Sequence, residues 1–409
     1  MNTAIDIEQS EEAGIASDAE QPGEQHKGLS YLLMAGHLCT DLNQGALTAV
    51  FPFLVVFSGF SYTEVAFLVF ASNAVSAVIQ PLFGWLGDRR ERPWLMALGM
   101  FLAGVGLAGV GLLDSYPLII ASAMLSGLGV AMFHPEGGRL ANLVAGKKKG
   151  SGMSIFAVGG NLGFAVGPML AVAGIGAFGL QGTFVFLVPS TVCAIVFLAM
   201  NGRFSQFGLV DEEVAADPDQ RDHWGLFALV MAVLSSRSII YYAITAYAAL
   251  FIVAELGQAE AVGSIMITVF ATFSAVATVL SGRVAGRVGV QRLMQGTYVV
   301  LAALLVCFAL SRVLPLSVLV LALIGLSQAI SYPSTVALGQ SFVPRHLGMA
   351  SGLSFGVVVC VGGMFSPILG AIGDTVGLTT VMFLIAGFAL LAAGISAVIA
   401  RLVPHARVQ

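Results

Sequence analysis

The sequence contains few charged residues for its length. Only 10% of its 409 residues are Asp, Glu, Lys or Arg, whereas a soluble domain carries about 25%. Hydrophobic residues make up 57% of the chain, which is more apolar surface than a soluble protein of this size could bury. The composition therefore excludes a soluble globular protein, and the net charge of -4 gives no basis for binding nucleic acid.

Signatures of enzymes, ATP-driven pumps and metal sites are also missing. The glycine-rich segments lie within apolar runs rather than after a strand, and none is followed by a Walker-type lysine. The six histidines show no metal-ligand spacing, and the four cysteines all lie in apolar runs, where they serve as small packing residues. We therefore expect no enzyme activity, no cofactor and no metal.

The chain does contain a long series of apolar windows of about 20 residues, each long enough to cross a bilayer. We predict an all-α polytopic membrane protein with twelve transmembrane helices. The expected spans are 29–57, 62–83, 94–113, 116–142, 150–176, 181–201, 224–254, 260–281, 293–312, 315–343, 347–371 and 378–402. The acidic segment 1–28 has no signal-peptide features, so we expect a disordered cytoplasmic tail, and 403–409 forms a short second tail.

The placement of lysine and arginine predicts the orientation. Of the 18 lysines and arginines, all but Arg312, Arg139 and Arg237 fall in tails or loops on one side of the predicted membrane. Such residues collect on the cytoplasmic side, so both termini are expected to be cytoplasmic. Arg139 and Arg237 lie within spans.

The second half of the chain repeats the first. Gly84-Trp85-Leu86-Gly87-Asp88-Arg89 returns as Gly282-Arg283-Val284-Ala285-Gly286-Arg287, and Pro135 returns as Pro333. A repeat of about 200 residues predicts two pseudo-symmetric six-helix bundles. This architecture resembles the major facilitator superfamily, and the resemblance implies a substrate path between the halves. We expect the bundles and the cytoplasmic linker between them at 29–201, 224–402 and 202–223.

The segment between spans 2 and 3 resembles the loop signature of that superfamily. Gly84, Asp88, Arg89 and Arg92 match the pattern, and Glu91 stands where a glycine is usual. Asp88 can cap and pair with arginines at the cytoplasmic helix ends, which would latch one state of a transport cycle. The alternative is a plain basic loop that only sets topology.

Span 5 contains Gly163, Gly167 and Pro168 in a Gly-x-x-x-Gly-Pro arrangement that resembles the superfamily's antiporter motif. Small residues let helices approach closely, and proline bends the axis. Ordinary helix packing alone also explains the glycines. Because the motif is associated with exporters, the resemblance favours efflux.

A closer resemblance is carried by spans 1 and 4. His37, Asp41 and Gln44, together with Phe133-His134-Pro135-Glu136 and Arg139, resemble the fosmidomycin resistance protein family. The resemblance covers essentially the whole chain after the acidic tail. It implies proton-driven efflux of a small-molecule drug through the bacterial inner membrane, by a monomer embedded in the lipid bilayer.

The intramembrane carboxylates are the candidates for proton coupling. His37 and Asp41 are four residues apart and share a helix face, and a cavity with changing solvation can load and unload a buried Asp41. Glu136 is the second candidate, with His134 beside it. Structural roles are the alternatives: hydrogen bonding for His37 and Asp41, and for Glu136 an ion pair with Arg139 that holds a bend.

The lone cation of span 7 is the candidate for substrate binding. We expect Arg237 to lie across the cavity from Asp41 and to bind an anionic substrate when Asp41 is protonated. Packing or an interfacial belt is the alternative for the nearby tyrosines. The other expected substrate-binding residues are Tyr241, Tyr242, Gln44, Gln328 and Tyr332.

We therefore predict a proton-coupled antiporter that exports a small anionic or amphipathic compound by alternating access. Two alternatives stay open. One is a proton-coupled importer of an organic anion or a sugar, and the other is a membrane sensor that transports nothing.

Overall fold

A computed structural model of the protein describes residues 26–89, 92–144, 149–207, 222–343, 350, 353–354 and 358–403. The described elements are helices, and no strand occurs among these residues. Residues 1–25, 208–221 and 404–409 lie outside the described residues, and with them most of the predicted acidic tail, linker and C-terminal tail.

Two groups of helices follow each other along the chain. The first group comprises α2 (Lys27–Ala49), α3 (Phe51–Ser58), α4 (Tyr62–Arg89), α5 (Trp94–Leu112), α6 (Tyr116–Val144), α7 (Lys149–Phe178), η3 (Gly179–Phe186), α8 (Leu187–Ala199), α9 (Asn201–Phe204) and η4 (Ser205–Phe207). The second comprises α10 (Trp224–Leu256), α11 (Glu260–Val288), α12 (Val290–Leu310), α13 (Leu314–Ile330), α14 (Tyr332–Ser341), α16 (Val358–Val376) and α17 (Leu378–Leu402).

The membrane spans correspond closely to the predicted ones. Ten helices of the described chain are long and apolar enough to cross a membrane, or 11 if α2 and α3, bent by 41°, form one span. One of these stretches, Ile155–Ala199, is 45 residues long and contains two predicted spans. The chain reverses within it at Gly179, where φ is 65°, and the backbones of Gly174 and Gly182 come into contact. Counted as two antiparallel spans, this stretch brings the total to the predicted twelve.

Prolines interrupt two of the spans. Pro52 stands at the start of α3, directly after the bend, and Pro333 stands at the start of α14, directly after α13 ends. Proline lacks the N–H that would continue the helical hydrogen bonds. Pro135, the counterpart of Pro333 in the repeat, lies inside the uninterrupted α6, so the two proline sites of the repeat differ in form.

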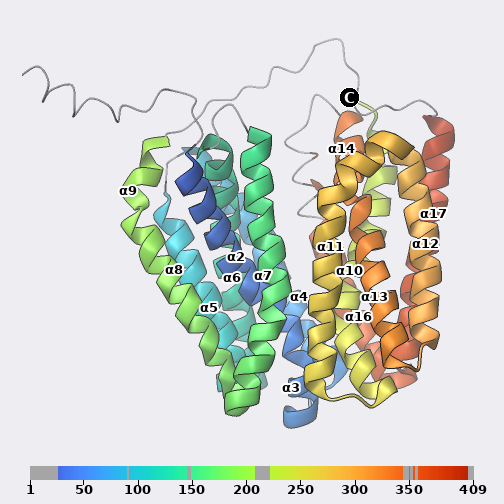
Figure 1. Ribbon diagram of the computed structural model, residues 1–409, viewed down its shortest axis with the longest axis horizontal. Coiled ribbons are helices and arrows are strands. Elements are labelled where there is room, and N and C mark those ends of the chain that lie inside the picture. Colours follow the sequence, from blue (N-terminus) through green and yellow to red (C-terminus); the bar gives the residue numbers. More distant parts are fainter. Residues whose placement is uncertain are drawn as a thin grey trace, which may run out of the picture.

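The two groups of helices stand side by side (Figure 1). They converge at the end where α3 and the beginning of α4 lie, and α14 and the end of α17 lie at the other end. Helix α4 of the first group packs on α16 of the second, and α7 packs on α11. The boundaries predicted for the two bundles stay a prediction.

A line of glycines joins α7 to α2. A Cβ atom added to Gly163 would lie 2.5 Å from the carbonyl oxygen of Leu38, and Cβ atoms on Gly159 and Gly167 would collide with the carbonyl oxygens of Met34 and Leu42. The backbones of the two helices are therefore in direct contact, as expected where glycines recur every four residues. This contact fixes α2, which carries Asp41, against α7.

Candidate functional site

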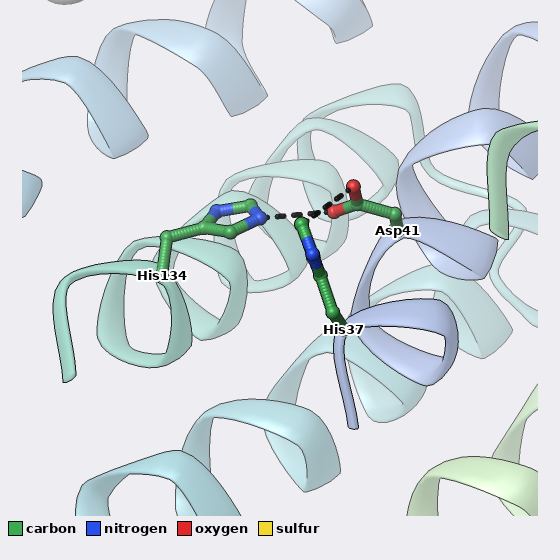
Figure 2. Close-up of side chains that lie close together, drawn as sticks. All are labelled: His37, Asp41 and His134. Carbon is green, nitrogen blue, oxygen red and sulfur yellow. Dashed lines mark hydrogen bonds and ion pairs between the residues drawn. The ribbon is translucent and has the colours of Figure 1, made fainter. Parts of the chain in front are cut away.

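Asp41 lies between two histidines inside the first group of helices (Figure 2). Its side chain is buried, with 4% of the residue exposed. Nε2 of His37, one turn earlier on α2, lies 3.1 Å from Oδ2, and Nε2 of His134 on α6 lies 3.0 Å from Oδ1. The spacing of His37 and Asp41 was predicted, but the approach of His134 from another helix was not, because sequence separation carries no information on that contact.

The hydrogen bonds of His37 require a shared proton. Its Nδ1 lies 2.7 Å from the carbonyl oxygen of Phe156 on α7, and a carbonyl can only accept, so Nδ1 carries hydrogen. In a neutral ring Nε2 is then an acceptor, and it faces a carboxylate oxygen, which is also an acceptor when ionised. A proton must therefore lie between His37 and Asp41, either on the imidazole ring or on the carboxyl group.

Aromatic rings and a glycine enclose this group. The ring of Phe156 stacks on His37 with centroids 4.0 Å apart, and the ring of Phe133 is 6.1 Å away. A Cβ atom on Gly160 would lie 2.6 Å from both Oδ2 of Asp41 and Cε1 of His37. Gly160 thus leaves space for the His–Asp contact, a role that its place in a glycine-rich run did not reveal.

The same three side chains have the donor atoms of a metal site. The ligand atoms of His37, Asp41 and His134 all lie within 4.8 Å of one another. Hydrogen bonds between the rings and the carboxylate account for this arrangement without an ion. The expectation of no resident metal stays a prediction.

Glu136 forms a two-point ion pair with Arg139. Nε of Arg139 donates to Oε2 at 2.9 Å and Nη2 donates to Oε1 at 2.6 Å, and Glu136 is 6% exposed. Such forked contacts are strong and directional. The geometry contains the ion pair of the structural alternative, while a bend held by this pair and a coupling role for Glu136 both stay predictions.

A small cavity of about 50 Å³ lies between the two groups of helices. Three predicted substrate residues, Gln44, Tyr241 and Tyr242, line it. The other lining residues are Gly45, Leu47, Thr48, Val69, Ser72, Asn73, Phe164, Thr245, Ile267, Phe270 and Ala271. None of these described lining residues carries a charge, and Gln44 is one turn along α2 from Asp41.

The other predicted substrate residues form a cluster next to the cavity. Nε of Arg237 donates to the carbonyl oxygen of Gln328 at 3.1 Å, and Nε2 of Gln328 donates to the carbonyl oxygen of Arg237 at 2.8 Å. The guanidinium carbon of Arg237 lies 3.8 Å from the ring centroid of Tyr332 and 5.6 Å from that of Tyr241. Tyr241 therefore connects the cluster to the cavity, and Arg237 itself is not among the lining residues.

One polar atom in this cluster lacks a partner. Oε1 of Gln328 is buried without a hydrogen bond, and no carboxylate pairs with Arg237 among the described residues. Buried polar groups in proteins are nearly always bonded. Oε1 of Gln328 is thus available to a ligand or to water.

The predicted loop signature lies at the edge of the described chain. Gly84, Asp88 and Arg89 fall in the last turns of α4, where side chains are outside the described part, and Arg92 follows after α4 has ended. Their gating role stays a prediction.

Comparison with known proteins shows what the chain resembles. The model of the Major Facilitator Superfamily matches residues 33–367 and 226–409. The MFS-type transporter YfnC of Bacillus subtilis (strain 168) is 30% identical over 390 residues, covering 90% of this chain and 91% of that protein. The fosmidomycin resistance protein of Escherichia coli (strain K12) is 27% identical over 358 residues, covering 85% and 86%.

Solved structures share the fold. An inward-facing, occupied bacterial homologue of the lysosomal transporter Spinster superposes with a TM-score of 0.75 at 13% identity, over 94% of this chain and 98% of that one. A D-xylose-proton symporter superposes with a TM-score of 0.72 at 16% identity, over 90% and 96%.

Membrane-spanning helices in two groups, with a cavity between them, define a multi-pass membrane transporter. The chain belongs to the Major Facilitator Superfamily. This confirms the predicted fold class and the family, and two of its relatives bear the names of transporters.

Proposed function

We propose that this protein is a proton-coupled antiporter that exports a small anionic or amphipathic compound by alternating access. The observation that carries the proposal is the close contact between Nε2 of His37 and Oδ2 of Asp41, one turn from the cavity, from which we infer a shared proton. A buried carboxylate whose protonation depends on a neighbouring histidine and on access to water can load and release a proton in each cycle.

The direction of transport is supported by two further observations. The glycine face of α7 that resembles the antiporter motif contacts α2 directly, so the motif and the proton site belong to one packed pair of helices. A relative that covers most of the chain bears the name fosmidomycin resistance protein, and resistance is what an exporter of a toxic compound provides.

The substrate proposal combines the cavity and the Arg237 cluster. The uncharged, largely aromatic and aliphatic cavity suits an apolar or neutral body, and the guanidinium of Arg237 with the free oxygen of Gln328 suits a polar or anionic end group. An amphipathic compound would contact both in a state with a wider cavity, with Tyr241 between its two parts.

The test uses purified protein in liposomes that contain a pH-sensitive dye, with fosmidomycin as the first probe and a panel of organic anions after it. Antiport predicts that a substrate gradient moves protons in the opposite direction, and that an uncoupler abolishes uphill transport. Proton movement in the same direction as the substrate would replace antiport with import. If every probe binds but none is transported, the protein is a membrane sensor and the proposal is wrong.

The proposed setting is the bacterial inner membrane, with both termini in the cytoplasm and a monomer as the working unit. The excess of lysine and arginine in loops on one side supports this orientation.

A further inference from the structure

Asp374, near the end of α16, binds the beginning of α4 in the opposite group of helices. Its Oδ1 accepts the backbone N–H of Tyr62 at 2.8 Å, and its Oδ2 accepts the N–H of Thr63 at 3.0 Å and the Thr63 hydroxyl at 2.5 Å. A carboxylate at this position also interacts favourably with the positive end of the helix dipole.

The beginning of α4 has a second carboxylate of its own. Glu64 accepts the N–H of Ser61 at 2.8 Å, and Oγ of Ser61 accepts the N–H of Glu64 at 3.2 Å. This reciprocal pair is a capping box and lies entirely within the first group of helices. Asp374 accepts the N–H groups of Tyr62 and Thr63, which the capping box leaves without a partner. It therefore links the two groups of helices and does not replace a local cap.

The backbone of α16 comes close to α4 at the same place. A Cβ atom on Gly370 would lie 2.9 Å from Cα of Thr63 and 2.9 Å from the hydroxyl oxygen of Tyr247, and one on Gly373 would lie 3.3 Å from the ring of Tyr62. Gly370, Gly373 and Asp374 thus form one contact face. An added methyl group at Gly370 would force the helices apart.

This face lies at the end where the two groups converge (Figure 1). Among the described residues, two other hydrogen bonds join the groups: the hydroxyl of Ser264 donates to the carbonyl oxygen of Ala49 at 2.7 Å, and that of Thr268 donates to the carbonyl oxygen of Ala165 at 2.9 Å. Of the side chains making these bonds, only Asp374 is charged. A carrier that works by alternating access must break them when this end opens.

The geometry points to Asp374 as a positioning residue that holds the α3–α4 end of the carrier closed, by binding the N-terminus of α4 across the two groups. This contact sets the ratio of two states of the carrier: one open at the end where α14 lies, and one open at the end where α4 begins. The inference rests on alternating access and not on the direction, the coupling ion or the substrate proposed above.

Hydrogen–deuterium exchange of the full-length protein in lipid nanodiscs, read by mass spectrometry, tests it. Asp374→Ala should raise exchange around 62–69 and 366–376, and should at the same time lower it at the other end, around 80–89 and 334–343. A helix-terminal carboxylate of this kind corresponds to about a two- to fivefold shift in the ratio of the two states. Asp374→Asn should give a smaller shift, because it keeps an acceptor and loses the charge.

Glu64→Ala is the matched control, since it weakens the same helix end without touching α16. It should raise exchange near residue 62 and leave the opposite end unchanged. Gly370→Ala keeps Asp374 and adds a methyl group between α16 and α4. It should also raise exchange at the α4 end and lower it at the opposite end. If Asp374→Ala and Gly370→Ala both change only the local segment, as Glu64→Ala does, Asp374 is a structural cap and the inference is wrong. Failure of transport with every probe would overturn the proposed function but would not alter this pattern.

Discussion

At the scale of single residues, the shared proton between His37 and Asp41 depends on a carbonyl group in a third segment. Phe156 fixes which nitrogen of His37 carries hydrogen, and thereby which nitrogen faces the carboxylate. His134 approaches the other carboxylate oxygen from α6. Three helices therefore set the protonation of one side chain, and a shift of any of them changes it.

Asp41→Asn should abolish proton-driven transport while exchange of substrate for substrate continues, because the amide cannot take up or release a proton in this pH range. Uphill transport and counterflow are measured in liposomes between about pH 5.5 and 8, the range in which histidine changes its charge. Asp114→Asn, an exposed carboxylate in a loop, is the control and should behave as wild type. Uphill transport by the Asp41 variant at wild-type rate would remove Asp41 from the coupling mechanism.

Arg237→Ala should weaken binding of anionic probes by about 10-fold or more, the loss expected for a charge-assisted hydrogen bond. Neutral probes that occupy only the cavity should lose far less. Arg312→Ala serves as the control, because Arg312 also lies over an aromatic ring, at 5.8 Å from Phe251, but lies away from the cavity. Equal losses for anionic and neutral probes would assign Arg237 a structural role.

At the scale of helices, the α2–α7 contact positions the proton site. Gly163→Ala should lower the stability by about 1–3 kcal/mol, the range for overpacking, and should disturb coupling, because the new methyl group lies 2.9 Å from Cβ of Asp41. Gly176→Ala, on the same helix with no atom within 4 Å of its added Cβ, should be neutral or slightly stabilising. Thermal unfolding and proton-coupled flux of both variants measure the difference. Identical behaviour of the two would show that the contact is loose.

The Glu136–Arg139 ion pair lies within α6, directly after Pro135. Glu136→Gln and Arg139→Gln should each lower stability by about 1–3 kcal/mol, since each removes one half of a partly buried ion pair, and the double variant should lose less than the sum. A double-mutant cycle by thermal unfolding measures this coupling. A Glu136→Gln variant that folds normally but loses proton-driven transport would instead support the coupling role predicted from the sequence.

The positions of the helices could be predicted from the sequence, whereas most contacts between helices could not. Apolar windows and the repeat predicted the spans, because crossing a bilayer imposes a length and composition on each segment. The spacing of His37 and Asp41 predicted their shared face. The approach of His134 and the cap from Asp374 depend on packing between distant segments, and nothing in the local sequence encodes those distances. For Arg237 the sequence predicted a place on the cavity wall, whereas the structure places it beside that wall, behind Tyr241.

At the scale of the whole molecule, the two groups of helices are expected to form separately folding units. A chain divided within 208–221 and expressed as two pieces should reassemble, because the groups meet by helix packing and hydrogen bonds, and no described helix belongs to both. Co-purification with a tag on one piece, followed by a transport assay, measures the outcome. A chain divided inside α10, after Ala248, is the control and should not reassemble. If the two pieces from the cut within 208–221 did not co-purify from membranes, the predicted division into two bundles would be contradicted.

The absence of charge from the cavity wall has a consequence for how such a carrier can change over generations. Thr245 and Ile267 lie in the second group of helices, and their substitution alters the shape of the cavity, while neither is among the contacts of the His37–Asp41 pair or of Asp374. Under the proposed function, substitution of cavity-lining residues is therefore expected to change which compound is carried without changing proton coupling or the contact at Asp374.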